Sequence, residues 1–188
     1  MSATATTGLV LAAGGGLRFG GIKQLADVDG RPLVEHAIRA LAATPAIDPI
    51  VVVLGAHAGE IEARVDFHGA RRVVCADWAA GMSASLRCGL AAAGDTGEVV
   101  VVLADQPFIT AAAIQRVLAT PGAAARAVYG GVPGHPVVLR GPVLARAGEL
   151  RGDSGFRDLL AGAAQVECGD VADARDIDTR EDLEVVRR

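Results

Sequence analysis

The chain has 188 residues and a formal net charge of -4, and this length suits one well-buried core, so we expect a single domain over residues 1–188. The acidic balance disfavours nucleic acids and anionic membranes as partners. No apolar run reaches the roughly 20 residues that cross a bilayer, and the N-terminal stretch lacks the positive region of a signal peptide, so we expect a cytoplasmic protein.

The first predicted element is an apolar strand that ends at three glycines. Residues 9–13 read LVLAA, and glycines occupy positions 14–16. Glycines allow successive backbone N–H groups to converge on one point, and Arg18 and Lys23 follow where phosphate oxygens would lie. The pattern therefore predicts a buried strand that opens into a nucleotide-phosphate loop.

Strands and helices alternate along the rest of the chain. The most apolar strand, at 98–104, should lie at the centre of the sheet, residues 133–136 should form a turn, and Ser83 or Ser85 should open a helix that continues to about residue 93. Further helices are predicted at 32–43, 55–65, 110–118 and 155–160 and after the Thr179-x-x-Asp182 signature, and further strands at 50–54, 71–75, 127–131, 137–139 and 165–168.

This alternation predicts an α/β fold with a mainly parallel sheet, right-handed crossovers and helices on both faces. Ligands of such folds bind beyond the carboxyl ends of the strands. The glycine loop and Asp105, which directly follows the strand at 98–104, should therefore share one edge of the sheet.

The glycine loop has two familiar alternatives, and neither fits well. A dinucleotide-binding loop of the G-x-G-x-x-G kind needs a carboxylate at the end of the second strand, but that strand ends at Leu54, Gly55 and Ala56. A Walker A loop needs a G-K-[ST] sequence, which is absent. A plain tight turn would explain the glycines, although it leaves Arg18 and Lys23 without a role.

Asp105 needs a partner, because an unpaired buried carboxylate costs several kcal/mol. A cation, a hydrogen-bond donor or a hard metal ion such as Mg²⁺ would serve. Asp176 and Asp178 form a D-x-D pair further along the chain. Alternate residues of an extended segment face opposite ways, so at most one should reach the same site, and we favour Asp178.

The segments LAAGGGLRFGGIKQL, GMSASL, LADQP, GHPVVL, GDSGFRDLL and DIDTREDL occur in this order between residues 9 and 183. Together they resemble the molybdenum cofactor cytidylyltransferase branch of the MobA-like NTP transferase family. The resemblance implies a Rossmann-like nucleotidyltransferase fold and nucleotidyl transfer that depends on Mg²⁺.

The resemblance also implies roles for individual residues. Arg18 and Lys23 would be the catalytic cations on the triphosphate, and Asp105 would hold the metal, with Asp178 as our choice for a second ligand. Gly134 and His135 would lie beside the acceptor, and residues 152–155 would form either a plain loop or a wall of the pterin pocket. The nucleotide would contact Leu11, Ala12, Ala13, Gly14, Gly15, Gly16, Gly81, Met82, Ser83 and Ser85.

The implied reaction transfers CMP from CTP to the terminal phosphate of molybdopterin and releases pyrophosphate. Ala13, Met82 and Ser83 favour CTP, because the guanylyl-transferring branch usually reads L-A-G-G and G-P-L-A-G at these places. Another small phosphorylated acceptor stays open, and a molybdoenzyme or its chaperone is a conceivable protein partner. Two alternatives from other classes are an oxidoreductase that uses a flavin or NAD(P)H and a non-catalytic chaperone of the molybdenum cofactor.

Overall fold

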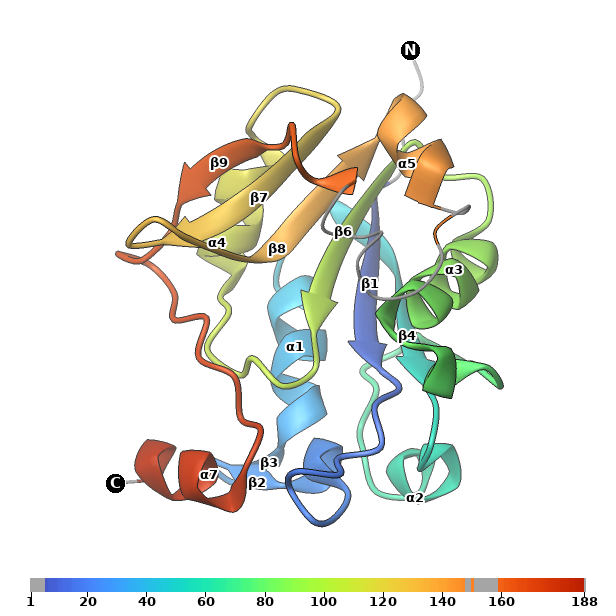
Figure 1. Cartoon of the computed structure of the whole chain (residues 1–188), viewed down its shortest axis with the longest axis vertical. Coiled ribbons are helices and arrows are strands. Elements are labelled where there is room, and N and C mark those ends of the chain that lie inside the picture. Colours follow the sequence, from blue (N-terminus) through green and yellow to red (C-terminus); the bar gives the residue numbers. More distant parts are fainter. Residues whose placement is uncertain (1–5, 148–149, 151–158, 188) are drawn as a thin grey trace.

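The computed structural model describes residues 6–147, 150 and 159–187 (Figure 1). Their strands form one seven-stranded sheet in the order β5-β4-β1-β6-β8-β7-β9, and β2 and β3 form a separate two-stranded sheet. The strands are β1 (Thr6–Ala12), β2 (Asp27–Val28), β3 (Arg31–Pro32), β4 (Ile47–Leu54), β5 (Arg71–Val74), β6 (Glu98–Leu103), β7 (Ala124–Tyr129), β8 (Val132–Arg140) and β9 (Ala164–Glu167).

The large sheet is mainly parallel, as expected. β1 pairs in parallel with β4 and β6, β5 with β4, and β9 with β7, whereas β8 runs antiparallel to both of its neighbours. β6 is the fourth of the seven strands, which confirms the central position predicted from its apolar run. The carboxyl ends of β1 and β6 point to the lower edge of the sheet in Figure 1.

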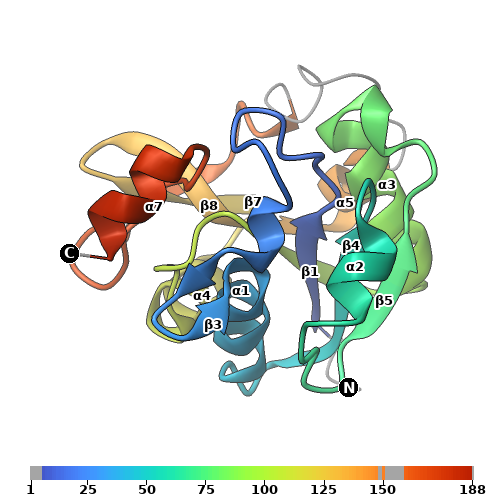
Figure 2. The ribbon, with the colours of Figure 1, turned by 90° about the horizontal axis from the view of Figure 1, so that it is seen from below.

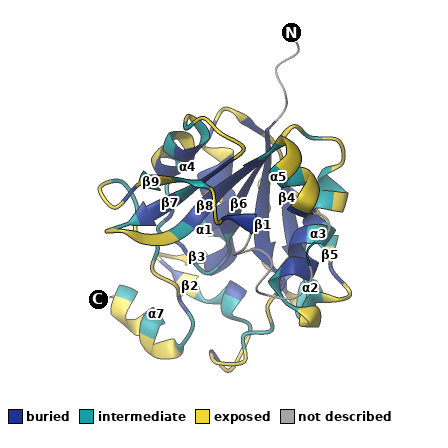
Figure 3. Ribbon diagram, turned by 45° about the horizontal axis from the view of Figure 1, so that its top comes forward, coloured by how far each residue is buried: buried dark blue, intermediate teal, exposed yellow. Residues whose placement is uncertain are grey.

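Helices cover both faces of the sheet because alternate side chains of a strand point to opposite sides. Val10 and Ala12 of β1 join the core under α1 and α4, whereas Leu9 and Leu11 join the core under α3 and α5. Figure 2 shows α1 and α4 on one side of the sheet and α3 on the other. The inner strands β1 and β6 are almost fully buried between these layers (Figure 3), which explains their continuous apolar sequences.

Helices α1, α2, α3, α4 and α7 overlap the predicted helices, whereas α5 was not predicted. The helices are α1 (Leu33–Ala42), α2 (Ala58–Glu62), α3 (Met82–Ala93), α4 (Ala111–Leu118), α5 (Gly141–Ala147) and α7 (Arg180–Val186), with 3-10 helices η1 (Lys23–Leu25) and η2 (Trp78–Ala80). Thr110 caps α4, and Thr179 of the predicted signature caps α7. Their side-chain oxygens accept hydrogen bonds from Ala113 N and Asp182 N, respectively. No helix in the described part of the chain is both long enough and apolar enough to span a membrane.

Two local predictions are wrong. Ser83 and Ser85 do not cap α3, whose N-cap is Gly81, with φ +100 and no side-chain cap. Residues 133–136 belong to β8, and the turn before them consists of Gly130 and Gly131, whose positive φ angles suit a two-residue hairpin. The predicted helix at 155–160 lies almost entirely outside the described residues.

The prolines fit into β8 because of where they lie along it. The pairing of β8 with β6 reaches only from Val137 to Arg140, so residues 132–136 lie beyond that pairing and have β7 as their neighbouring strand. A proline lacks the backbone N–H that a central strand uses on its second side. The missing donors therefore cost little in this part of the strand.

Candidate active site

The loop after β1 is held in a tight conformation that needs glycine at one position above all. Gly16 has φ +65, and its carbonyl accepts hydrogen bonds from Phe19 N and Gly20 N, both at 3.0 Å. A Cβ atom at Gly16 would lie 2.3 Å from the carbonyl oxygen of Gly21. Because backbone cannot yield at that distance, a side chain at position 16 is incompatible with this loop.

A buried glutamine joins the loop to the end of β1. Gln24 Nε2 donates to Ala12 O at 2.9 Å and to Gly14 O at 2.7 Å, and the residue is 3% exposed. These bonds fix the backbone where the strand becomes the glycine loop. Gln24 was not among the predicted site residues, and its one signal in the sequence was its position next to Lys23.

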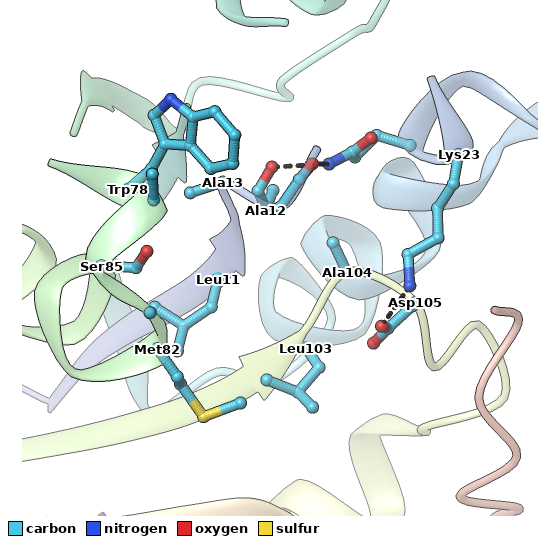
Figure 4. A pocket seen from close by; sticks show the side chains of 14 residues that line it. Leu11, Ala12, Ala13, Lys23, Trp78, Met82, Ser85, Leu103, Ala104 and Asp105 are labelled. Carbon is cyan, nitrogen blue, oxygen red and sulfur yellow. Dashed lines mark hydrogen bonds and ion pairs between the residues drawn. The ribbon is translucent and has the colours of Figure 1, made fainter. Parts of the chain in front are cut away.

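The structure brings the four predicted charged residues together beyond the carboxyl ends of β1 and β6. Lys23 Nζ lies 2.7 Å from Asp105 Oδ2 and 2.8 Å from Asp178 Oδ1, and Arg18 Nη2 lies 2.8 Å from Asp178 Oδ2. Figure 4 shows Lys23 reaching Asp105 at the edge of a pocket. Lys23 is thus the cationic partner that the position of Asp105 required.

The Lys23 ammonium stays charged in this setting. Burial alone would lower the pKa of Lys23, but the neighbouring charges of Asp105 and Asp178 outweigh burial and hold this pKa above its ordinary value. Asp176 forms no ion pair with Lys23, and its carboxylate accepts a hydrogen bond from Gln106 Nε2 at 2.8 Å instead. Of the D-x-D pair, only Asp178 binds Lys23.

The carboxylates of Asp105 and Asp178 also suit a divalent cation. Both bind a single nitrogen, so they already share one cationic centre. Asp105 Oδ1 is buried and has no hydrogen-bond partner among the described residues. Those residues contain no group of three or more His, Cys, Asp or Glu side chains that could hold a metal. The arrangement fits Mg²⁺, which commonly takes one or two carboxylates and completes its shell with substrate phosphates and water.

A smaller cavity of about 300 Å³ lies beside these charges (Figure 4). It includes seven of the ten predicted nucleotide contacts: Leu11, Ala12, Ala13, Gly14, Gly81, Met82 and Ser85. Ser83 is fully buried and does not line it, because its side chain lies inside the packed face of α3. Trp78, the one tryptophan of the chain, lines the cavity and was missed by the sequence analysis.

A larger cavity of about 1120 Å³ adjoins the smaller one, and both are lined by Gly14, Lys23, Gly81 and Met82. The residues that line only the larger cavity include two further loop glycines, two charged residues that contact each other, and two polar residues of the β7–β8 hairpin. These are Gly15, Gly16, Arg18, Asp178, Arg126 and His135.

His135 reaches this cavity, and Gly134 does not. A Cβ at Gly134 would lie 3.0 Å from the Tyr129 ring, so this glycine packs against the hairpin. Tyr129 Oη donates to the carbonyl of His135 at 2.6 Å. Burial, and then the charge of Arg126, lowers the pKa of His135 to about 4, so its imidazole is neutral at neutral pH. Residues 152–155, predicted as a loop or pocket wall, lie outside the described residues.

The chain is similar to curated proteins with different named activities. Nicotine blue oxidoreductase of Paenarthrobacter nicotinovorans is 35% identical to this chain and the match covers 94% of each. The 2-C-methyl-D-erythritol 4-phosphate cytidylyltransferase of Ralstonia nicotianae is 34% identical over 69% of this chain and 55% of its own length.

Among solved structures, Rv0371c from Mycobacterium tuberculosis H37Rv superimposes with a TM-score of 0.85 at 30% identity, over 99% of this chain and 98% of its own. Another structure of Rv0371c, in complex with manganese, has a TM-score of 0.78 at 28% identity and covers 97% of this chain and 98% of its own. The family model of the MobA-like NTP transferase domain matches residues 8–168, which include the glycine loop, Lys23 and Asp105. The chain therefore belongs to the MobA-like NTP transferase family and carries a nucleotidyltransferase domain.

Proposed function

We propose that the chain is a Mg²⁺-dependent nucleotidyltransferase that moves CMP from CTP to a small phosphorylated acceptor, of which molybdopterin is the favoured case. The observation that carries the proposal is the position of Lys23. Its ammonium lies between Asp105 and Asp178, where the smaller and the larger cavity meet. One cation and two carboxylates at such a junction suit a phosphate chain that runs from one cavity into the other.

The two cavities divide the substrates between them. The smaller cavity would take the base and ribose, with the Trp78 ring as an apolar face beside the base. The larger cavity would take the triphosphate and the acceptor, with the glycine loop and Arg18 along the phosphates. The proposed enzyme is one domain over residues 1–188. Its site includes Asp178, which lies beyond the segment that the family model matches.

The reaction forms one bond and breaks one. An oxygen of the acceptor phosphate forms a bond to the α-phosphorus of CTP, the bond from that phosphorus to the bridging oxygen breaks, and pyrophosphate leaves. A phosphate oxygen is already ionised at neutral pH, so no general base is needed. Catalysis would come from holding both phosphates in line and from neutralising their charge with Lys23 and Arg18.

Asp105 and Asp178 would hold the Mg²⁺. When bound, the ion supplies further neutralisation of the phosphate oxygens. Lys23 would then contact the phosphates from the same position at the mouth of both cavities. Ala13 and Met82 favour CTP over GTP, and the match to a protein named as a cytidylyltransferase supports CTP.

The test measures pyrophosphate release from purified protein with Mg²⁺ and each of CTP, GTP, ATP and UTP. The acceptor is molybdopterin, with small sugar phosphates in parallel. We expect CTP to give the fastest release and the largest stabilisation against heat. Asp105→Asn should slow release by roughly 100-fold or more, whereas Arg71→Gln, on exposed edge strand β5, should not change it. Release that is absent with every nucleotide, or unaffected by Asp105→Asn, would refute the proposal.

A second candidate is an oxidoreductase that uses a flavin or NAD(P)H. The match to nicotine blue oxidoreductase, over 94% of both chains, favours this alternative. A visible flavin absorbance that bleaches on reduction, or NADPH-dependent reduction of a dye, would support it. Binding of pterin without pyrophosphate release would instead indicate a chaperone of the molybdenum cofactor.

A further inference from the structure

Arg126 is a cation that lines the larger cavity but does not belong to the group of contacting charges formed by Arg18, Lys23, Asp105 and Asp178. It lies in β7, and both Arg126 and the neighbouring His135 line the cavity. The Nε atom of Arg126 is buried and has no hydrogen-bond partner among residues 6–147, 150 and 159–187. Burial lowers the pKa of Arg126, which reflects the cost of holding its charge away from water.

Arg140 shows what a structural arginine of the same sheet looks like. Its Nε binds Glu98, its Nη1 donates to the carbonyls of Thr120 and Gly122 at 3.1 Å, and its Nη2 donates to Leu118 O at 2.8 Å. Every nitrogen of that guanidinium is used inside the fold. Arg126 has no ion pair within the described part of the chain, so its charge is not balanced there in the same way.

The charges of the larger cavity are therefore uneven. At one place Arg18 and Lys23 face Asp105 and Asp178, so two positive charges meet two negative ones. At the other place Arg126 faces His135, whose imidazole is neutral at neutral pH. The positive charge of Arg126 is close enough to His135 to lower the pKa of that imidazole. A partly buried, unbalanced guanidinium is stabilised when a bound anion supplies the missing charge.

We propose that Arg126, with His135 beside it, forms an anion-binding subsite for the phosphate monoester of the acceptor. The subsite is distinct from the Arg18 and Lys23 positions that take the triphosphate. A guanidinium presents parallel N–H groups that match phosphate oxygens, and a neutral imidazole adds a hydrogen bond without adding charge. This inference rests on the proposed nucleotidyl transfer for the identity of the acceptor, while the anion-binding property can be measured independently.

The experiment separates this subsite from the triphosphate site. The protein is first saturated with Mg²⁺ and a non-hydrolysable CTP analogue, and inorganic phosphate is then titrated into it in a calorimeter. With the triphosphate positions filled, we expect one phosphate to bind the wild-type protein. Arg126→Gln should weaken this binding about tenfold or more, which is the value of a charge-assisted hydrogen bond. Arg126→Lys keeps the charge but loses the parallel N–H groups of the guanidinium, so its phosphate affinity should lie between those of wild type and Arg126→Gln. Arg71→Gln should bind phosphate like the wild type.

The outcomes distinguish the subsite from the proposed function. Equal phosphate affinity in Arg126→Gln and wild type, or no phosphate binding by the wild type, would overturn the subsite. If the CTP analogue itself does not bind, the proposed function fails, and the same titration on protein without nucleotide still compares Arg126→Gln with wild type. Where transfer is active, Arg126→Gln should raise the acceptor KM and leave CTP binding unchanged. An equal loss of both would contradict a separate acceptor subsite.

Discussion

Lowering the pH should destabilise the folded chain through His135. In the folded chain, burial and then the charge of Arg126 lower the pKa of His135 from 6.5 to about 4. Between these two values the unfolded chain binds a proton that the folded chain does not. The free energy of unfolding therefore rises with pH across this window, and this contribution is lost as the pH falls from about 6.5 towards about 4.

The size of the effect follows from the two pKa values. The difference of 6.5 minus about 4 is about 2.5 pH units. At 1.36 kcal/mol per unit, full protonation of His135 would cost the fold about 3 kcal/mol. That is a large part of the stability of an ordinary domain, which is roughly 5–15 kcal/mol. Acid should thus unfold this protein more readily than a variant with an uncharged polar side chain at position 135.

Urea unfolding at neutral and acidic pH measures this effect directly. Carboxylates titrate in the same range, so the informative quantity is the difference between wild type and His135→Gln, which should lose less stability on acidification. Arg126→Met provides a second measurement, because removing that charge should raise the pKa of His135 in an NMR titration of the imidazole. If wild type and His135→Gln lose equal stability, or His135 titrates near its ordinary value, the reasoning is wrong.

Three further predictions concern the loop and the smaller cavity. Lys23→Met should slow pyrophosphate release about 100-fold or more and lower the free energy of unfolding in urea, because it leaves two carboxylates facing each other. Gly16→Ala should weaken nucleotide binding in a thermal-shift assay more than Gly20→Ala, since both have positive φ but only the Cβ at position 16 meets backbone, at 2.3 Å. Trp78→Ala should weaken CTP binding about tenfold and Trp78→Phe should restore most of it, as measured by calorimetry. Unchanged pyrophosphate release in Lys23→Met would contradict the first prediction, and equal losses of nucleotide binding in Gly16→Ala and Gly20→Ala the second. Unchanged CTP affinity in Trp78→Ala would contradict the third.

The sequence predicted the centre of the sheet because β1 and β6 are buried on both faces. A continuous apolar run such as residues 98–103 is typical of a central strand, and β6 is one. The turn at 133–136 was predicted wrongly because a proline, considered without its neighbouring strands, is a strong turn signal. Their tolerance in β8 depends on how far the pairing of β8 with β6 extends, which is a property of the assembled sheet.

The site was predicted where a motif and a strand end coincide. Lys23 and Asp105 were expected at one edge of the sheet, and their contact follows from parallel neighbouring strands. Gln24, Trp78 and Arg126 were missed, because their roles depend on which distant backbone or cavity each side chain reaches. No local pattern distinguishes Arg126 from an arginine on the outer side of a strand.

The contact between Lys23 and Asp178 joins positions 155 residues apart. The same C-terminal segment places Arg180 over the Phe19 ring, with 5.1 Å between the guanidinium carbon and the ring centroid, and Ile177 N donates to Asp105 O at 2.9 Å. A chain emerging from the ribosome can thus form most of its sheet while Lys23 still has only one of its two carboxylates. The proposed nucleotide site would then be complete only after this C-terminal segment has docked. A partly synthesised or misfolded chain would therefore bind a nucleotide poorly.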